Sequence, residues 1–131
     1  MKIADIVAMA AARIKAAQAS IATFADQLVK DPEHAVHWST SLFGDTANLY
    51  AWKLVHNLAE NGCEMDAVVD TLREYLVGGA ARPSNTSNFA ANYLEQEKVR
   101  AIAEIYRDFE RRQRILKQMT EAQAAQVKGK S

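Results

Sequence analysis

Residues 3–28 read IADIVAMAAARIKAAQASIATFADQL, and their apolar side chains recur in alternating steps of four and three. A strict period of 3.5 residues is typical of a helix that packs along its length against a nearly parallel neighbour. Alanine at two of these positions lets the neighbouring backbone come close. The stretch therefore predicts a long helix over residues 2–30 and, with it, an all-α fold. The residues on this heptad face are Ile3, Val7, Ala10, Ile14, Ala17, Ile21, Phe24 and Leu28.

The chain after this helix continues with helical patterns that are separated by short breaks. Asp31-Pro32 ends the first helix, because the residue before a proline is pushed out of the α region. The same pair can begin a helix, so a short one is expected at about 33–38. A second main helix follows at about 41–60, and Asn61-Gly62 supplies its left-handed end.

A third helix is expected at about 64–77, with Gly78-Gly79 ending it. Residues 78–87, GGAARPSNTS, predict a loop, since these residue types break or cap helices. The last helix then runs over about 88–126, and residues 127–131 form a frayed tail. We predict a single domain over residues 1–126: an all-α helical bundle of about four main helices plus one short helix.

The last helix is too long for the body that the other helices can build. Close to forty residues of helix measure about 55–60 Å, whereas a compact domain of this size has a radius of gyration of about 14 Å. No proline or glycine precedes Gly129 to kink it. The helix should therefore overhang the body or lie against another chain. We expect a homo-oligomer, most simply a homodimer, joined through the coiled-coil-like face of the first helix, the overhanging last helix, or both.

Composition excludes several classes of protein. Hydrophobic residues make up 49% and charged residues 24%, and the net charge is zero, so the whole chain has no electrostatic preference for nucleic acid or anionic lipid. Cys63 is the only cysteine, which fits a reducing compartment. The apolar stretch after Lys2 is interrupted by Asp5, which argues against a secretory signal. No apolar run approaches the roughly 18 residues of a membrane span. We expect a cytoplasmic protein with no membrane partner.

Charge is distributed unevenly along the chain. Residues 1–97 hold seven Lys or Arg and twelve Asp or Glu, a formal charge of −5, whereas residues 98–131 hold nine and four, a charge of +5. A solvated helix face, a protein-binding surface and a nucleic-acid site all fit the basic residues, although Asp108 and Glu110 dilute them, so nucleic acid is not the favoured partner. This basic cluster consists of Arg107, Arg111, Arg112, Arg114 and Lys117.

Metal-ligand spacings occur but are weak. His34 and His37 lie three residues apart, and His56 and Glu60 lie four apart, so each pair shares a helical face. Cys63 and Asp45 could complete a ligand set. No HExxH or CxxC pattern is present, and surface or core-edge histidines explain the spacing better. We predict no metal and no cofactor.

Catalytic features are equally weak. Cys63 follows Gly62 at the start of a helix, where the helix dipole could lower a thiol pKa, yet such a cysteine is more often a packing residue. Residues 58–68 have the rhythm of a helix-turn-helix, but four acids on the second helix would repel phosphates. Residues 84–88, SNTSN, could hold an anion at a helix start, although capping is the commoner role. No residue is assigned as catalytic.

Aromatic side chains leave one ligand-binding hypothesis open. Trp52, His56 and Tyr93 could line a pocket between helices, as ligands often bind there in a bundle. Long helices, divided charge and the lack of a catalytic constellation nevertheless favour a non-enzymatic protein–protein interaction module: an adaptor, accessory subunit or inhibitor. The alternatives are a small helical enzyme or ligand-binding bundle, and nucleic-acid binding through the basic last helix.

Overall fold

A computed structural model describes residues 1–81 and 89–129 of the 131-residue chain. These residues form an all-α helical bundle, which confirms the predicted fold class. A 3₁₀ turn, η1 (Pro32–His34), leads directly into the second helix. The four α-helices are α1 (Ile3–Lys30), α2 (Ala35–Glu60), α3 (Met65–Ala81) and α4 (Phe89–Gly129).

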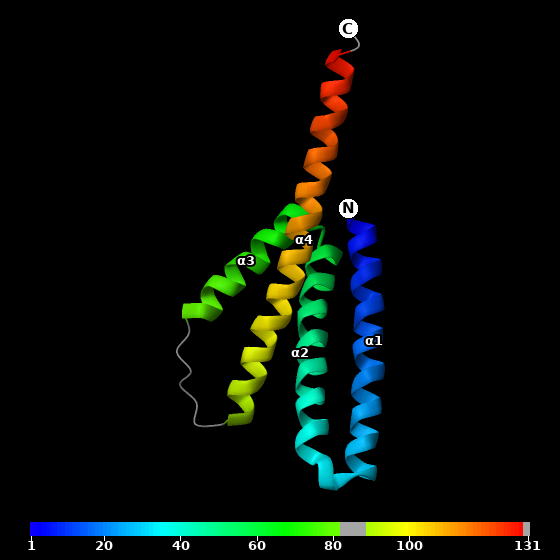
Figure 1. Cartoon of the computed structure of the whole chain (residues 1–131), viewed down its shortest axis with the longest axis vertical. Coiled ribbons are helices and arrows are strands. Elements are labelled where there is room, and N and C mark those ends of the chain that lie inside the picture. Colours follow the sequence, from blue (N-terminus) through cyan, green and yellow to red (C-terminus); the bar gives the residue numbers. More distant parts are fainter. Residues whose placement is uncertain (82–88, 130–131) are drawn as a thin grey trace.

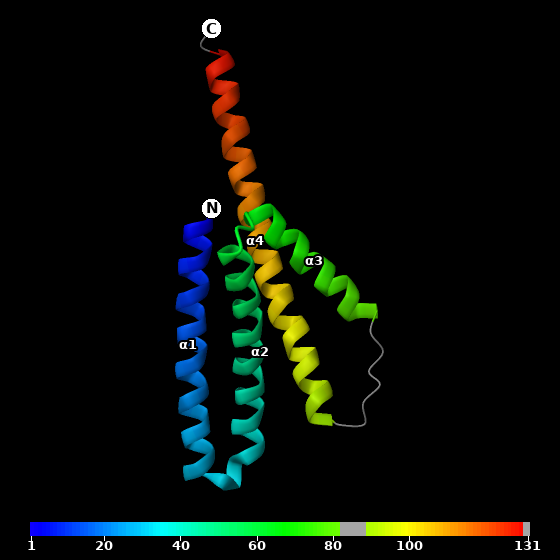
Figure 2. The same ribbon diagram turned by 180° about the vertical axis from the view of Figure 1, so that it is seen from behind.

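The helices alternate in direction and lie in a row (Figure 1). α1 and α2 form an antiparallel hairpin, α4 packs against α2, and α3 packs against α4. Figure 2 shows the same order from behind, with α1 and α3 at the two edges. Because α4 is flanked by α2 and α3, its first half is the element that joins the two edges of the bundle.

α2 of the same chain supplies the nearly parallel neighbour that the heptad pattern of α1 requires. The buried side chains of α2 are small, which permits its neighbours a close approach. Ile6 and Ala10 of α1 are fully buried. Ile6 is not on the predicted 3.5-residue face: a straight helix has 3.6 residues per turn, so its buried stripe drifts across a strict heptad. The buried positions of α2 recur every fourth residue: Ala47, Ala51, Val55 and Ala59.

The centre of the core lies where α4 meets its two neighbours. Ile102 and Phe109 of α4 are fully buried, together with Leu72 of α3 and Val55 of α2. The ring of Phe109 stands edge-on to the indole of Trp52, with ring centroids 6.2 Å apart. This geometry is the favourable one for two aromatic rings. Apolar packing around Phe109 therefore holds three of the four helices together.

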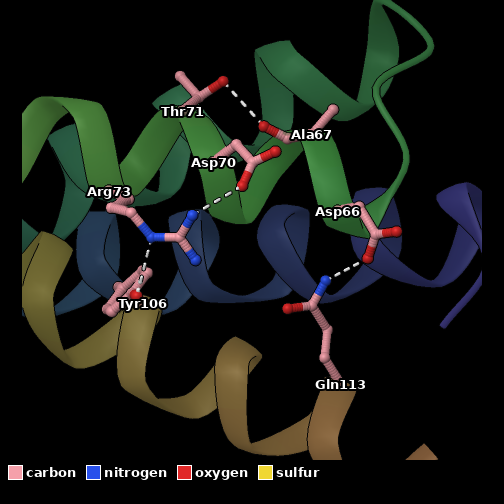
Figure 3. Close-up of polar contacts among 7 residues, drawn as sticks. All are labelled: Asp66, Ala67, Asp70, Thr71, Arg73, Tyr106 and Gln113. Carbon is pink, nitrogen blue, oxygen red and sulfur yellow. Dashed lines mark hydrogen bonds and ion pairs between the residues drawn. The ribbon is translucent and has the colours of Figure 1, made fainter. Parts of the chain in front are cut away.

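Polar side chains bridge α3 and α4 at the edge of this core (Figure 3). The guanidinium of Arg73 donates one hydrogen bond to the Tyr106 hydroxyl at 3.2 Å and one to the Asp70 carboxylate at 3.1 Å. The amide of Gln113 donates to the Asp66 carboxylate. These contacts are exposed to solvent, so they set the register of α3 on α4 more than they stabilise the pair.

Two predicted helix boundaries are wrong at the start of α2. The expected short helix over 33–38 and the second helix over 41–60 are one continuous helix. The intervening polar residues do not break it, because their hydroxyls bond back within the helix. Thr40 donates to the carbonyl of Val36 at 2.8 Å, and Ser41 donates to that of His37 at 3.3 Å.

Two other helices end later in the chain than expected. α3 continues through Gly78-Gly79 to Ala81, since a glycine weakens a helix by only about 1 kcal/mol and alanines follow. The tail predicted to fray from residue 127 is helical up to Gly129. The remainder of the predicted loop, and the caps expected at 84–88, fall on residues 82–88, outside the described residues.

The turn between α2 and α3 forms as the sequence predicts. Gly62 has a φ of 88°, in the left-handed region. Its amide donates to the carbonyl of Ala59 at 3.0 Å, and the amide of Cys63 donates to that of Leu58 at 3.0 Å. This pair of bonds is the Schellman motif, which satisfies the last carbonyls of a helix.

Gly62→Ala should lower the free energy of unfolding by about 1 kcal/mol, because alanine is disfavoured in the left-handed region. Nothing lies within 4 Å of a Cβ placed at Gly62 or at Gly78, so neither change creates a clash. Gly78→Ala, within α3, should instead raise this free energy by up to about 1 kcal/mol. Urea denaturation followed by circular dichroism measures both. Equal effects of the two changes would contradict the assigned backbone conformations.

Phe109→Ala should lower the free energy of unfolding by about 3–5 kcal/mol, because it leaves a cavity where three helices meet. Val36→Ala is the matched control: Val36 is also apolar and helical but 83% exposed, so the change should stay within about 0.5 kcal/mol. Both values come from denaturation at one protein concentration. A loss below about 1 kcal/mol at Phe109 would show that the core is centred elsewhere.

Candidate interaction surface

The second part of α4 extends beyond the other helices (Figures 1 and 2). Every side chain from Arg114 to Gly129 is exposed, and we call residues 114–129 the projecting segment. At about 1.5 Å per residue it is about 24 Å long. The overhang expected from the length of the last helix is therefore present.

The projecting segment continues the buried stripe of α4. From Ile105 and Phe109 in the core, steps of three and four residues lead through Arg112 to Leu116 and Met119. Leu116 and Met119 are 44% and 55% exposed. Further exposed apolar side chains are Ile115 and Val127, at 49% and 71%. The face that packs against the body in the first half of α4 is thus uncovered in the second half.

These apolar residues were not among the predicted site residues. The signal was present in the sequence, because Ile105, Phe109, Leu116 and Met119 keep the spacing of one helical face. The sequence predicts the basic residues of α4 instead, because a cluster of charge is visible without knowing where the body ends. Only the tertiary structure shows that the neighbours of α4 stop near Gln113.

The predicted basic cluster is divided between paired and unpaired cations. Arg111 and Arg112 both donate to the carboxylate of Asp108, each at 2.9 Å. The side chain of Arg107 donates to the backbone carbonyl of Ala103 at 3.3 Å. Within the described part of the chain, Arg107, Arg114 and Lys117 have no carboxylate partner. Three of the five cations therefore keep their charge available to a partner.

Asp108 is the electrostatic centre of this cluster. Partial burial acts to raise the pKa of its carboxyl group, but the hydrogen bonds and charges of Arg112 and Arg111 outweigh it, so the pKa lies below its ordinary value. The carboxylate stays ionised at neutral pH and neutralises much of the charge of the two guanidinium groups. The cluster is consequently less attractive to phosphate than its five cations suggest.

A hollow of about 540 Å³ lies where the projecting segment leaves the body. Its walls come from the start of α1, the start of α3 and the middle of α4. Met1, Ile3, Met65 and Leu116 give it an apolar lining. We call it the junction hollow; Lys2, Glu64, Asp66 and Gln113 complete its lining.

Tyr93 lies apart from Trp52 and His56, the other two residues of the predicted pocket, which are four residues apart on α2. Trp52 lines an open groove between α1, α2 and α4, and the guanidinium of Arg13 lies over its ring at 5.8 Å. The ring of Tyr93 packs against that of Phe43 at a tilt of 59°, with centroids 5.7 Å apart. Phe43 precedes Trp52 by nine residues of α2, a rise of about 14 Å, so Tyr93 lies at a different level of the bundle. The ring of His56 lies 3.5 Å from the carboxylate of Glu60.

The candidate metal ligands are also dispersed. His34 pairs with Asp31 at 2.8 Å, and the His37 ring stands edge-on to Trp38. Asp45 accepts a hydrogen bond from Ser20, while Cys63 is partly buried after the α2–α3 turn. Among the described residues, no three His, Cys, Asp or Glu side chains are placed to hold a metal ion.

No helix in residues 1–81 or 89–129 combines the length and apolar character needed to cross a membrane. No protein-family model, curated protein or solved structure matches this chain. The function is therefore inferred from the residues and their geometry alone.

The carboxyl group of Asp108 should titrate below its ordinary value of 3.8. Because the folded pKa is depressed, the carboxylate stabilises the fold above its unfolded pKa, and this contribution is lost as the pH falls through the folded pKa. Carboxyl NMR titration measures the value. Arg111→Gln and Arg112→Gln should each raise it, whereas Arg114→Gln should leave it unchanged. An unshifted value in either of the first two variants would exclude that arginine as a partner.

Proposed function

We propose that this chain is a non-enzymatic interaction module that presents the projecting segment of α4 to another protein chain, as an adaptor, accessory subunit or inhibitor does. The observation that carries the proposal is a helix exposed on all sides that still bears the apolar stripe of the core. A helix with one apolar stripe is stabilised mainly by packing that stripe. A partner helix or groove would supply this packing.

The free energy of association favours a protein partner that covers more surface than the apolar stripe. Fully burying an aliphatic side chain contributes about 1.5–3 kcal/mol, and Ile115, Leu116 and Met119 each have roughly half of this left to gain. Association itself costs at least about 4 kcal/mol in lost freedom. The three side chains alone therefore barely offset association, so we include the junction hollow and the unpaired cations in the proposed surface.

The charges indicate an acidic partner. By helical spacing, Arg107 and Arg114 lie on the face of α4 opposite the apolar stripe, and Lys117 lies between that face and the stripe. Opposite charge on a partner would steer its approach and fix its register. Nucleic acid is the weaker candidate, because the carboxylate of Asp108 already occupies Arg111 and Arg112.

A double substitution, Leu116→Glu with Met119→Glu, should abolish partner binding, because it places charge on the apolar stripe. The matched control, Val29→Glu with Val36→Glu, adds the same charge at two exposed apolar side chains of α1 and α2 that lie outside the proposed surface. Full-length chains are immobilised, exposed to a lysate of the cells that produce the protein, and the retained proteins are quantified. In parallel, light scattering measures self-association.

Wild type and control should retain the same protein, or show the same self-association, and the Leu116/Met119 variant should lose it by at least tenfold. A wild-type chain that is monomeric and retains nothing would refute the interaction function. Equal retention by both variants would show that the apolar stripe is not the binding surface.

A further inference from the structure

We infer that a second copy of this chain is the partner, with the projecting segment of each copy lying along α3 and over the junction hollow of the other. This inference rests on the proposed function and specifies its partner. It is argued from the exposed face of α3, from the division of charge and from the place where α3 begins.

The exposed face of α3 is acidic. Asp66, Asp70 and Glu74 recur every fourth residue along it, and Glu64 precedes the helix; all four are exposed. Arg73 is the one base among residues 64–78. Asp66 and Asp70 each accept one hydrogen bond within the chain, which leaves further acceptor capacity on each carboxylate. We call Glu64, Asp66, Asp70 and Glu74 the acidic face of α3.

The acidic face and the projecting segment are complementary in size and in charge. α3 has 17 residues and is about 25 Å long, and the projecting segment is about 24 Å long. The segment carries Arg114, Lys117 and Lys128 against Glu121. Val77, 67% exposed, adds an apolar side chain beyond Glu74 on the same helix.

The division of charge along the chain favours an identical partner. Residues 1–97 have a formal charge of −5 and residues 98–131 a charge of +5, which sum to zero. When two identical chains exchange their projecting segments, the basic segment of each copy meets the acidic face of α3 of the other, so both surfaces are matched at once. A different acidic partner would match the projecting segment alone and leave the acidic face of α3 unmatched.

The fold places the projecting segment and the acidic face of α3 where two copies can exchange their segments. α3 begins where α4 leaves the body and runs back toward the other end of the body while diverging from α4, whereas the projecting segment runs away from the body (Figures 1 and 2). If a second copy is turned end over end, each projecting segment therefore reaches the other copy's α3. The start of each projecting segment then lies near the two-fold axis, where Leu116 of each copy lines the junction hollow.

The antiparallel arrangement is also the one that electrostatics selects. A parallel pair would bring two positively charged segments side by side, which like-charge repulsion disfavours. In the antiparallel pair the contact of segment with α3 occurs twice about one axis, as in an isologous interface. Two copies of the contact double the surface area that is buried, and specific interfaces bury roughly 1,200–2,000 Å² in total.

The test uses two charge-reversed full-length variants. The first carries Arg114→Glu and Lys117→Glu, so that both its segment and its α3 are acidic. The second carries Glu64→Lys and Glu74→Lys, so that both are basic. All four side chains are exposed and have no ion pair in the described part of the chain, so circular dichroism should show both variants folded.

Light scattering should give the wild type a mass of twice 14.5 kDa, with a dissociation constant that rises at least tenfold from low salt to about 0.5 M salt. Each variant alone should dimerise at least tenfold more weakly than the wild type. An equimolar mixture should recover a dimer, because each acidic segment then meets a basic α3 and each basic segment an acidic α3.

Three results would overturn the inference: a monomeric wild type, a dimer insensitive to salt, or a mixture that stays as weak as its components. A monomer that still retains a different protein through Leu116 and Met119 leaves the interaction function standing and refutes only the identical partner. A monomer that retains nothing refutes both.

Discussion

The packing of the first half of α4 between α2 and α3 is the contact on which the rest of the structure depends. Phe109 and Ile102 are fully buried there, and the Phe109 ring meets Trp52 of α2 edge-on. α1 touches the bundle mainly through α2, and α3 mainly through α4. Without this stripe of α4, the α1–α2 hairpin and α3 would share almost no surface.

The same stripe explains why α4 is a candidate interaction element. Its apolar positions continue past Phe109 to Leu116 and Met119 after its neighbours have ended. One helix face is thus divided into an inner part, which is satisfied within the chain, and an outer part, which is not. The continuity is physical, because a straight helix keeps one face in line over its whole length.

The two exposed charged surfaces follow from the same arrangement. α3 turns its acidic residues outward because its apolar residues, Val68, Val69 and Leu72, face α4. α4 turns Arg107 and Arg114 outward for the corresponding reason. The bundle therefore separates charge between its edge at α3 and its projecting end, although the chain as a whole is neutral.

The sequence by itself determined the helical class, the heptad face of α1, the glycine turn at Gly62 and an α4 too long for its body. Each of these depends on local spacing or on one residue's backbone preference, and both are readable without neighbours. It did not determine that helix continues through Thr40-Ser41 and Gly78-Gly79, because weak local breakers yield to helix propagation and packing.

Only the tertiary structure decided which half of the α4 stripe is buried, that Asp108 holds two of the five cations, and that Trp52 and Tyr93 lie apart. Those facts depend on where neighbouring helices begin and end, which the spacing of residues along one helix does not determine.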